Sequence, residues 1–316
     1  MAYRYQVFGL YCASEMEIPA FFPVPSGEEK VDFRVQLGKV EEVFEEEAQV
    51  VEANSRMNEK EFFLEVEGVA RYFVRNGNQV TIEPLSEDMR DVLLYFKSNC
   101  MAAILFQRGK IPFHVSGVVD TDGGVWLFAG ESGMGKSTTA LKLLERGYAH
   151  FTDDTALIYV EDGQCWARAS YPMIKAWPTT VENQKVYRED SSFPIMSDWE
   201  KKGIYFHEQF INTPLKVKGI IFLNMEGEKI IIRPLKPLEG MMQLLPNVYR
   251  GDWVTALNQN ALQFKTVSEI ANTVNFCEAV RPLETSTFEA FATMIDLHII
   301  QQKIKSPEEN CIERVV

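Results

Sequence analysis

The chain lacks the features that mark secreted and membrane proteins. Its five cysteines (Cys12, Cys100, Cys165, Cys277 and Cys311) are scattered, odd in number and never in a Cys-x-x-Cys pair. This pattern predicts free thiols in a reducing compartment, so we expect a cytoplasmic protein. The start, "MAYRYQVFGLYCASEMEIPAF", carries charge within its apolar stretch and has no signal-peptide core. No run of about 18 apolar residues exists, and we therefore expect no membrane span.

Positive charge and clustered histidines are also scarce. The formal net charge is −13, the pI is near 4.9, and the sequence contains no basic run. Such a chain repels nucleic acid and anionic membranes, so we expect neither as a partner. The four histidines (His114, His150, His207 and His298) do not have the spacing of a metal site. The composition, 46% apolar and 24% charged, is that of an ordinary globular protein.

Strand-like and helix-like segments predict a mixed α/β fold, with mixed sheets flanked by helices. Residues 1–90 form a β-rich N-terminal subdomain by this pattern, with a turn at Asn76-Gly77. The acidic stretch 41–54 is expected to be a solvated loop or an exposed short helix. A long buried helix is predicted over 86–109, and we place the domain boundary near it. The expected domains are therefore 1–90, 91–306 and a frayed tail at 307–316.

The second domain alternates strands with helices. A hairpin is expected around Asp122 to Gly124, and strands are expected on either side of Asp162-Gly163 and of Glu226-Gly227. Helices are predicted from "KSTTALKLLERG", after Pro178, and at about 238–248, 252–272 and 286–304. The last of these places five apolar side chains on one stripe: Phe288, Phe291, Ala292, Ile295 and Ile299.

The segment "GESGMGKS" fits the phosphate-binding pattern G-x-x-x-x-G-K-[ST] between a strand and a helix. In such a loop the backbone N–H groups point at phosphate oxygens, and the helix adds its positive dipole end. Lys136 would reach the β- and γ-phosphates, and the Ser137 hydroxyl would ligate Mg²⁺. The alternative is a turn that enters a helix with an incidental lysine. The expected nucleotide-binding residues are Gly130, Glu131, Ser132, Gly133, Met134, Gly135, Lys136, Ser137 and Thr138.

Two adjacent carboxylates, Asp153 and Asp154, follow the loop after one short helix and strand. The base-reading N-K-x-D of GTPases and the L-S-G-G-Q of ABC-type ATPases are absent. Two carboxylates are more than Mg²⁺ ligation alone requires. One could hold the metal while the other accepts a proton from an attacking hydroxyl. The alternative is a polar turn between strands.

These residues together resemble the HPr kinase/phosphorylase superfamily, which has a PEP-carboxykinase-like P-loop fold. The resemblance rests on "FHVSG", which contains His114, on "GESGMGKS", on "LLERGY" and on "FTDD". Outside about 112–160 it is looser. There, "YPMIKAWP" and "LKVKGIIFL" are similar to shortened kinases of this superfamily found beside peptide-modifying genes, closest to the tailoring kinases of lasso-peptide pathways.

The resemblance implies a role for each site residue. Asp153 would be the base that takes the proton from the substrate hydroxyl, and Asp154 would help Ser137 to hold Mg²⁺. His114 would lie beside the phosphate site and orient the acidic pair or the nucleotide; the alternative is a buried structural histidine. The tailoring kinases phosphorylate a serine at the C-terminal end of a precursor peptide. The superfamily also includes hexamers, so a homo-oligomer stays open.

One departure from the superfamily concerns the metal site. The bacterial regulatory enzymes carry a downstream glutamate there, and "SYPMIKAWPTT" has no match for it. We therefore expect no action on HPr and no reverse phosphorylase reaction. Lys175 and Arg168 are candidates for a phosphate or peptide contact in this region. Arg233 and Arg250 are candidates for an arginine that assists transfer.

The sequence-based hypothesis is an ATP- and Mg²⁺-dependent kinase acting on a serine hydroxyl of a peptide or protein. Two alternatives stay open at this point. One is a kinase of free serine or a similar small molecule, and the other is a non-catalytic, nucleotide-regulated binding protein in peptide maturation.

Overall fold

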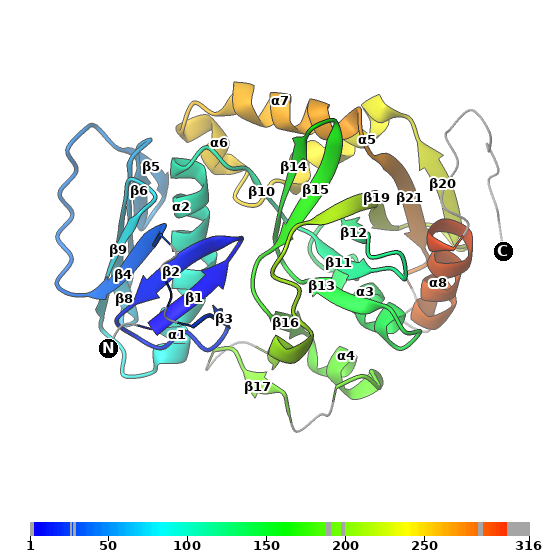
Figure 1. Ribbon diagram of the computed structural model, residues 1–316, viewed down its shortest axis with the longest axis horizontal. Helices are drawn as coiled ribbons and strands as arrows, with labels where there is room; N and C mark the ends of the chain where they lie inside the picture. The colour runs from blue at the N-terminus through cyan, green and yellow to red at the C-terminus, as the bar shows by residue number, and fades with distance from the viewer. Residues whose placement is uncertain are drawn as a thin grey trace.

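The computed structural model describes residues 3–25, 27, 30–187, 191–196, 200–283 and 287–301. Within these residues the expected mixed α/β fold is confirmed, with two large sheets, one small sheet and helices around them (Figure 1). None of the described helices is both long and apolar enough to cross a bilayer. The tail predicted at 307–316 lies outside the described residues.

The N-terminal residues build a nine-stranded sheet, as the β-rich pattern predicted. Its strands are β1 (Tyr3–Val7), β2 (Leu10–Ser14), β3 (Phe22–Pro23), β4 (Phe33–Leu37), β5 (Gln49–Glu52), β6 (Ser55–Met57), β7 (Glu61–Val66), β8 (Ala70–Arg75) and β9 (Gln79–Pro84). Their order is β3-β1-β2-β4-β9-β8-β7-β6-β5. The turn at Asn76-Gly77 is confirmed, with φ of 51° and 61°. Of the acidic stretch, only β5 at the sheet edge is regular structure, so no helix forms there.

The long helix predicted over 86–109 is confirmed, although it is not uniform. It consists of α1 (Met89–Tyr95), a π-helical turn (Phe96–Cys100) and α2 (Met101–Gln107). Asp88 caps its start by accepting a hydrogen bond from the backbone N–H of Arg90. Figure 1 shows the helix between the N-terminal sheet and the rest of the molecule. It contacts strands on both sides, so the domain boundary stays a prediction.

The second large sheet is centred on β12 (Val125–Ala129) and carries the phosphate loop. Val125, Leu127 and Ala129 belong to one hydrophobic core, while Trp126 and Phe128 belong to another. Because alternate side chains point to opposite faces, this strand is buried on both sides. The other strands are β10 (Pro112–Phe113), β11 (Ser116–Val119), β13 (Ala149–Thr152), β14 (Ala156–Glu161), β15 (Gln164–Ala169), β19 (Leu215–Met225), β20 (Ile231–Leu235) and β21 (Asn275–Arg281).

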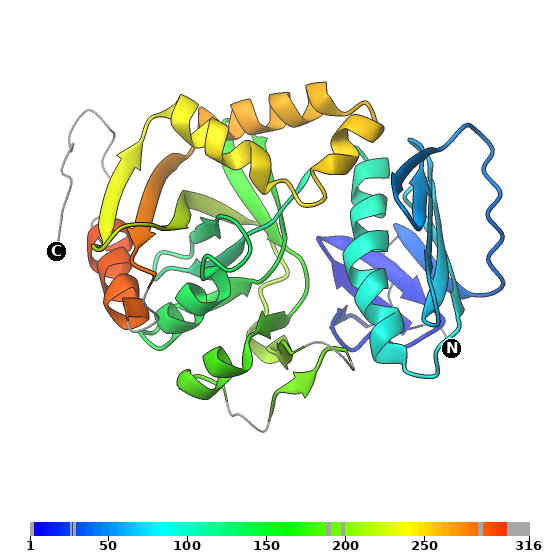
Figure 2. The same cartoon turned by 180° about the vertical axis from the view of Figure 1, so that it is seen from behind.

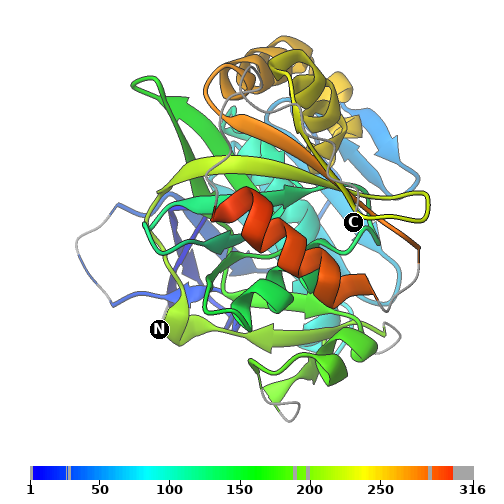
Figure 3. The same cartoon turned by 90° about the vertical axis from the view of Figure 1, so that its right-hand side faces the viewer.

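Helices cover both faces of this sheet (Figures 1 and 2). One face carries α3 (Lys136–Leu144) and α8 (Phe288–Ile295) with its π-helical end (Asp296–Ile300). The other face carries α5 (Pro237–Leu244), a 3₁₀ turn (Leu245–Asn247), α6 (Asp252–Ala256) and α7 (Asn260–Ala271). Figure 3 shows α8 lying across the sheet. The predicted apolar stripe of α8 is buried as expected, except that Phe288 is only partly buried.

Two details of the second domain differ from the sequence prediction. Strands β19 and β20 form around Glu226-Gly227, but they do not pair with each other. Strand β21, which the sequence pattern did not indicate, lies between them and runs parallel to β19. The helix predicted over 252–272 is divided into α6 and α7, because Asn258 has a left-handed φ of 54° that ends the first helix.

The third sheet is small. It consists of β16 (Met173–Ala176), β18 (Lys202–Tyr205) and β17 (Phe193–Pro194), in that order. The short helix expected after Pro178 is confirmed as α4 (Pro178–Asn183), and a 3₁₀ turn (His207–Gln209) follows β18. Pro178 begins α4, where its missing N–H has no helical partner to lose.

Candidate active site

The phosphate loop connects the end of β12 to the start of α3, as predicted. Gly130, Gly133 and Gly135 all have left-handed φ values, of 137°, 91° and 95°. At Gly130 a side chain is also excluded by space, because a Cβ atom there would lie 2.5 Å from the carbonyl oxygen of Leu223. The loop therefore depends on glycine both for its backbone conformation and for its close approach to β19.

Lys136 is folded back over its own loop. Its Nζ donates hydrogen bonds to the carbonyl oxygens of Gly130 (2.7 Å) and Glu131 (3.1 Å). The side chain is buried, and this burial lowers the pKa of Lys136 from its ordinary value. A cation held inside the ring of loop amides can exchange these carbonyl contacts for the oxygens of a phosphate.

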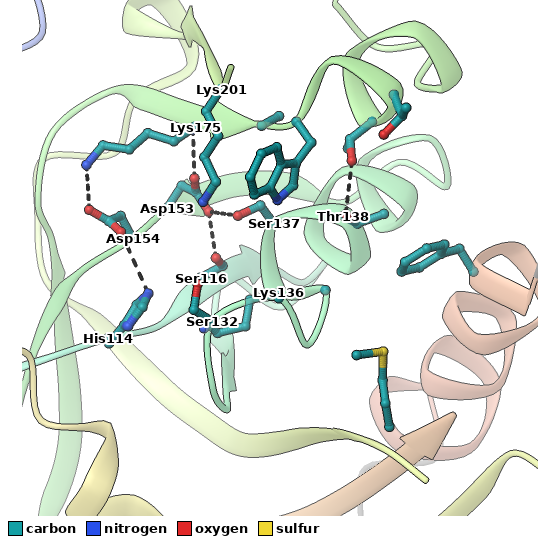
Figure 4. A pocket seen from close by; sticks show the side chains of 18 of the residues that line it. His114, Ser116, Ser132, Lys136, Ser137, Thr138, Asp153, Asp154, Lys175 and Lys201 are labelled. Carbon is teal, nitrogen blue, oxygen red and sulfur yellow. Dashed lines mark hydrogen bonds and ion pairs between the residues drawn. The ribbon is translucent and has the colours of Figure 1, made fainter. Parts of the chain in front are cut away.

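Asp153 is buried and makes three hydrogen bonds. Its Oδ1 accepts from the hydroxyls of Ser137 (2.7 Å) and Ser116 (2.6 Å), and its Oδ2 accepts from the backbone N–H of Lys175 (2.8 Å). These donors come from the phosphate helix, from β11 and from β16. Asp153 is therefore fixed against the first turn of α3, next to the serine expected to ligate the metal (Figure 4).

Asp154 points toward other partners. Its Oδ2 accepts from Lys175 Nζ at 2.6 Å, and its Oδ1 lies 3.7 Å from His114 Nε2. Burial alone would raise the pKa of Asp154, but Lys175 and then His114 hold it well below its usual range. Its backbone has a left-handed φ of 73°, which is uncommon for a residue other than glycine. The two neighbouring carboxylates therefore diverge from a strained turn.

His114 follows β10 and stays partly exposed at the site. Its backbone N–H donates to the carbonyl oxygen of Asn247 at 2.7 Å, and its ring packs edge-on to that of Tyr249. Burial lowers the pKa of His114, although Asp154 opposes the shift. Of the two readings of this residue, the structure supports a position beside the phosphate site rather than in a strand core.

A cavity of about 350 Å³ lies over the loop. Of the residues expected to bind nucleotide or catalyse transfer, those that line it are His114, Ser132, Gly133, Gly135, Lys136, Ser137, Thr138, Asp153 and Asp154. Met134 packs instead against the core between the sheet and α8. Residues that line the cavity but were not predicted as site residues include Ser116, Trp177, Lys201, Arg281 and Phe288. Below, this space is called the nucleotide cavity.

A second cavity, of about 510 Å³, borders the first. Gly130 and Glu131 line it, together with the segment 246–250 and Asp252. His114 and Ser132 line both spaces. The side chain of Asn247 connects the parts: its Oδ1 accepts from the N–H of Gly130 at 2.7 Å. The two cavities therefore meet at the start of the phosphate loop.

The four candidate cations have different fates. Lys175 lies in the site as the ion-pair partner of Asp154. Burial alone would lower the pKa of Lys175, but the charge of Asp154 outweighs burial and raises it. Arg250 lines the second cavity and pairs with Glu52 of the N-terminal sheet at 2.7 Å. Arg233 pairs with Glu278 and Glu239 outside both cavities. Arg168 lies against the turn at Gly9 and lines neither cavity.

The metal-binding capacity of the site rests on few protein ligands. Within the described ranges, no three His, Cys, Asp or Glu side chains are grouped as a metal site. Ser137 Oγ and Asp153 Oδ1 nevertheless offer two hard oxygens 2.7 Å apart at the loop. Mg²⁺ commonly keeps several waters and takes one or two protein oxygens together with substrate phosphates. The residues present therefore fit Mg²⁺ bound together with a nucleotide.

Comparison with known proteins gives a sparse result. No protein-family profile matches the chain, and no curated protein matches its sequence. Solved structures do match. One is the HPr(Ser) kinase/phosphatase from Coxiella burnetii, which is 12% identical, covers 61% of this chain and 98% of its own, and gives a TM-score of 0.30. The chemistry of the site therefore has to follow from its own residues.

Proposed function

We propose that the chain is an ATP- and Mg²⁺-dependent kinase that phosphorylates a serine hydroxyl of a peptide or protein. The observation that carries this proposal is the divergence of two adjacent carboxylates at a phosphate loop. Asp153 contacts the loop serine, and Asp154 faces His114 where two cavities meet. A nucleotide-binding protein without transfer chemistry needs only the first of these contacts.

On the donor side, the loop amides and Lys136 would hold the β- and γ-phosphates. Ser137 and Asp153 would hold Mg²⁺, which when bound neutralises the charge of the phosphates. Ser116 and the N–H of Lys175 fix the Asp153 carboxylate, so that it does not have to reorganise on binding.

This proposal exchanges the roles that the resemblance gave to the two aspartates. Asp153 is hydrogen bonded to the expected metal ligand Ser137, whereas Asp154 is not. A buried carboxylate that already accepts three hydrogen bonds has little capacity left to take a proton from a substrate. We therefore assign Asp153 to the metal side and Asp154 to the acceptor side.

In the transfer step, the serine oxygen forms a bond to the γ-phosphorus while the bond to the β–γ bridging oxygen breaks, which releases ADP. Asp154 would accept the hydroxyl hydrogen bond and receive the proton as transfer is completed. Lys175 keeps Asp154 ionised, and His114 faces the other carboxylate oxygen of Asp154. Because phosphoryl transfer passes through a loose transition state, such positioning supplies most of the catalysis.

We infer that the acceptor enters through the second cavity. His114 and Ser132 line both cavities, so a hydroxyl placed there would lie beside the loop and close to the phosphates. A volume of about 510 Å³ is in the range of pockets that bury drug-sized ligands, and is large for free serine. This favours a peptide acceptor. Following the sequence resemblance, we propose a lasso-peptide precursor with its serine at the C-terminal end.

The direct test is transfer of the γ-phosphate of radiolabelled ATP. A precursor-type peptide that ends in serine should be labelled, and the same peptide with alanine in that position should not. Labelling of free serine at an equal rate would instead support the small-molecule kinase. Tight ATP binding with no transfer to any acceptor would contradict the proposal and favour a nucleotide-regulated binding protein.

A further inference from the structure

One end of the nucleotide cavity is not used by this mechanism. Arg281 is the last residue of β21, and its side chain is only 3% exposed. Its guanidinium lies over the ring of Phe288, 4.1 Å from the ring centre. Both residues line the cavity. Because β12, β19 and β21 run parallel, the end of β21 lies at the same sheet edge as the phosphate loop.

The guanidinium of Arg281 is poorly compensated. One terminal nitrogen donates to the carbonyl oxygen of Pro282 at 3.2 Å, while Nε has no hydrogen-bond partner among the described residues. No ion pair of Arg281 occurs in the described part of the chain. Arg233, on the neighbouring strand, pairs with two carboxylates. Burial lowers the pKa of Arg281, which reflects the cost of keeping this charge away from water.

The stack lies directly against the phosphate loop. A Cβ atom at Gly135 would be 3.0 Å from Phe288 Cε1 and 3.6 Å from a terminal nitrogen of Arg281. The reacting groups Asp153 and Asp154 lie instead beside Lys175 and Lys201 (Figure 4). If the γ-phosphate lies at that end, the nucleoside must lie elsewhere over the loop.

We propose that the Arg281–Phe288 stack is the seat of the nucleobase of the donor nucleotide. A planar base would stack on the side of this pair that lines the cavity. Stacking on aromatic and guanidinium planes is favourable because every base has a π-face. This inference rests on the proposed function only in taking the cavity as a nucleotide site.

A second aromatic–cation pair in the cavity is the competing seat. Lys201 Nζ lies 5.2 Å from the centre of the Trp177 ring. However, the charge of Lys201 lowers the pKa of both Lys136 and Asp154. The Lys201–Trp177 pair therefore lies at the reacting end of the cavity. There it is suited to phosphate or acceptor rather than to the base.

The test compares ATP with inorganic tripolyphosphate, which has the phosphates and no nucleoside. Calorimetric titration of the full-length protein with Mg²⁺ present would give both dissociation constants. For Arg281→Ala and for Phe288→Ala we expect ATP binding to weaken about tenfold, while tripolyphosphate binding stays unchanged. Phe288→Tyr keeps the ring and should keep the affinity, and Arg233→Ala is the matched control for loss of an arginine.

Several results would overturn the assignment. An equal loss of ATP and tripolyphosphate affinity would make Arg281 a phosphate contact. A nucleoside-specific loss in Trp177→Ala, with Phe288→Ala unaffected, would move the base to the other pair. A wild-type protein that binds tripolyphosphate as tightly as ATP has no base seat at all. If the wild type binds neither compound, the proposed function itself fails.

Discussion

Asp153 and Asp154 are neighbours in the chain, yet their surroundings differ in kind. Asp153 is held by neutral donors: two hydroxyls and one backbone N–H. Asp154 is held by a cation, Lys175, and faces a histidine. The charge of Asp153 opposes the lowering of the pKa of buried His150, whose ring nitrogens have no hydrogen-bond partner in the described part of the chain. The charge of Asp154 likewise opposes the lowering of the pKa of buried Lys97.

Under the proposed function, this difference would let one turn contact both the nucleotide and the acceptor. Neutral donors leave the full negative charge of Asp153 available to a metal ion, whereas the ion pair of Asp154 keeps a carboxylate ionised while offsetting its charge near the phosphates. The left-handed φ of Asp154 turns the second side chain away from the first. The predictions below test whether this division holds, beginning with the largest effect.

The sharpest test exchanges each aspartate for asparagine. Asp154→Asn should lower the rate of phosphoryl transfer about a thousandfold, because the proton acceptor is lost, while ATP binding stays near the wild-type value. Asp153→Asn should weaken Mg²⁺-dependent ATP binding as well. Single-turnover rates and calorimetric ATP titrations would separate the two variants. If Asp154→Asn keeps its turnover, and Asp153→Asn loses turnover but still binds ATP, then Asp153 is the base, as the family resemblance implied.

Loss of the loop lysine affects the donor side alone. Lys136→Ala should lower transfer about a hundredfold and weaken ATP binding, since the contact to the β- and γ-phosphates is removed. Lys142→Ala is the matched control, because Lys142 lies on the same helix, pairs with Glu145 and lines neither cavity. Unchanged ATP affinity in Lys136→Ala would argue against the loop as the phosphate site.

His150, in the strand β13 that leads to Asp153, should make the stability of the fold sensitive to acid. Burial lowers the pKa of His150 to about 4 from 6.5, so the folded protein binds this proton less readily than the unfolded chain. The contribution of neutral His150 to the free energy of unfolding is about 3 kcal/mol. It is fully present above about pH 6.5 and is lost as the pH falls toward 4. His150→Phe, which can pack on Phe206, should lose less stability between pH 7 and pH 4.5. Denaturant unfolding curves would measure this, and parallel losses would contradict it.

The acceptor side is probed by Arg250, which lines the second cavity. Arg250→Ala should raise the KM for a peptide acceptor about tenfold, the size of one lost charged contact, with ATP affinity unchanged. Glu52→Gln removes the partner and keeps the arginine, and its half-exposed ion pair contributes less than about 1 kcal/mol. An equal change in both variants would mean that Arg250 acts through the N-terminal sheet rather than on the substrate.

The sequence was most informative where the structure is local. The loop from Gly130 to Ser137 and the helix after it follow from adjacent residues, because glycine φ values and helix capping depend on nearest neighbours. The groups that distinguish the aspartates do not. Ser116 and the N–H of Lys175 reach Asp153 only through the pairing of β11 with β13 and the packing of β16.

Arg281 shows the same limit more strongly. It reaches the loop because β21 inserts between β19 and β20, a strand order that no short-range pattern encodes. Phe288 did carry a signal, but as one member of an apolar stripe. The apolar residues of α8 do have helical periodicity, but Phe288, in the first turn, lines the cavity and does not pack in the core.

The side chain of Asn247 has a consequence for the order of events. Its Oδ1 accepts a hydrogen bond from the N–H of Gly130, the first glycine of the phosphate loop, and the backbone carbonyl oxygen of Asn247 accepts one from the N–H of His114. The residues next to Asn247 line the second cavity. An acceptor that shifts this segment must therefore shift the loop, so each substrate should alter the affinity for the other by the same factor. Titrating a peptide with and without a non-hydrolysable nucleotide would detect this coupling, and Asn247→Ala should abolish it.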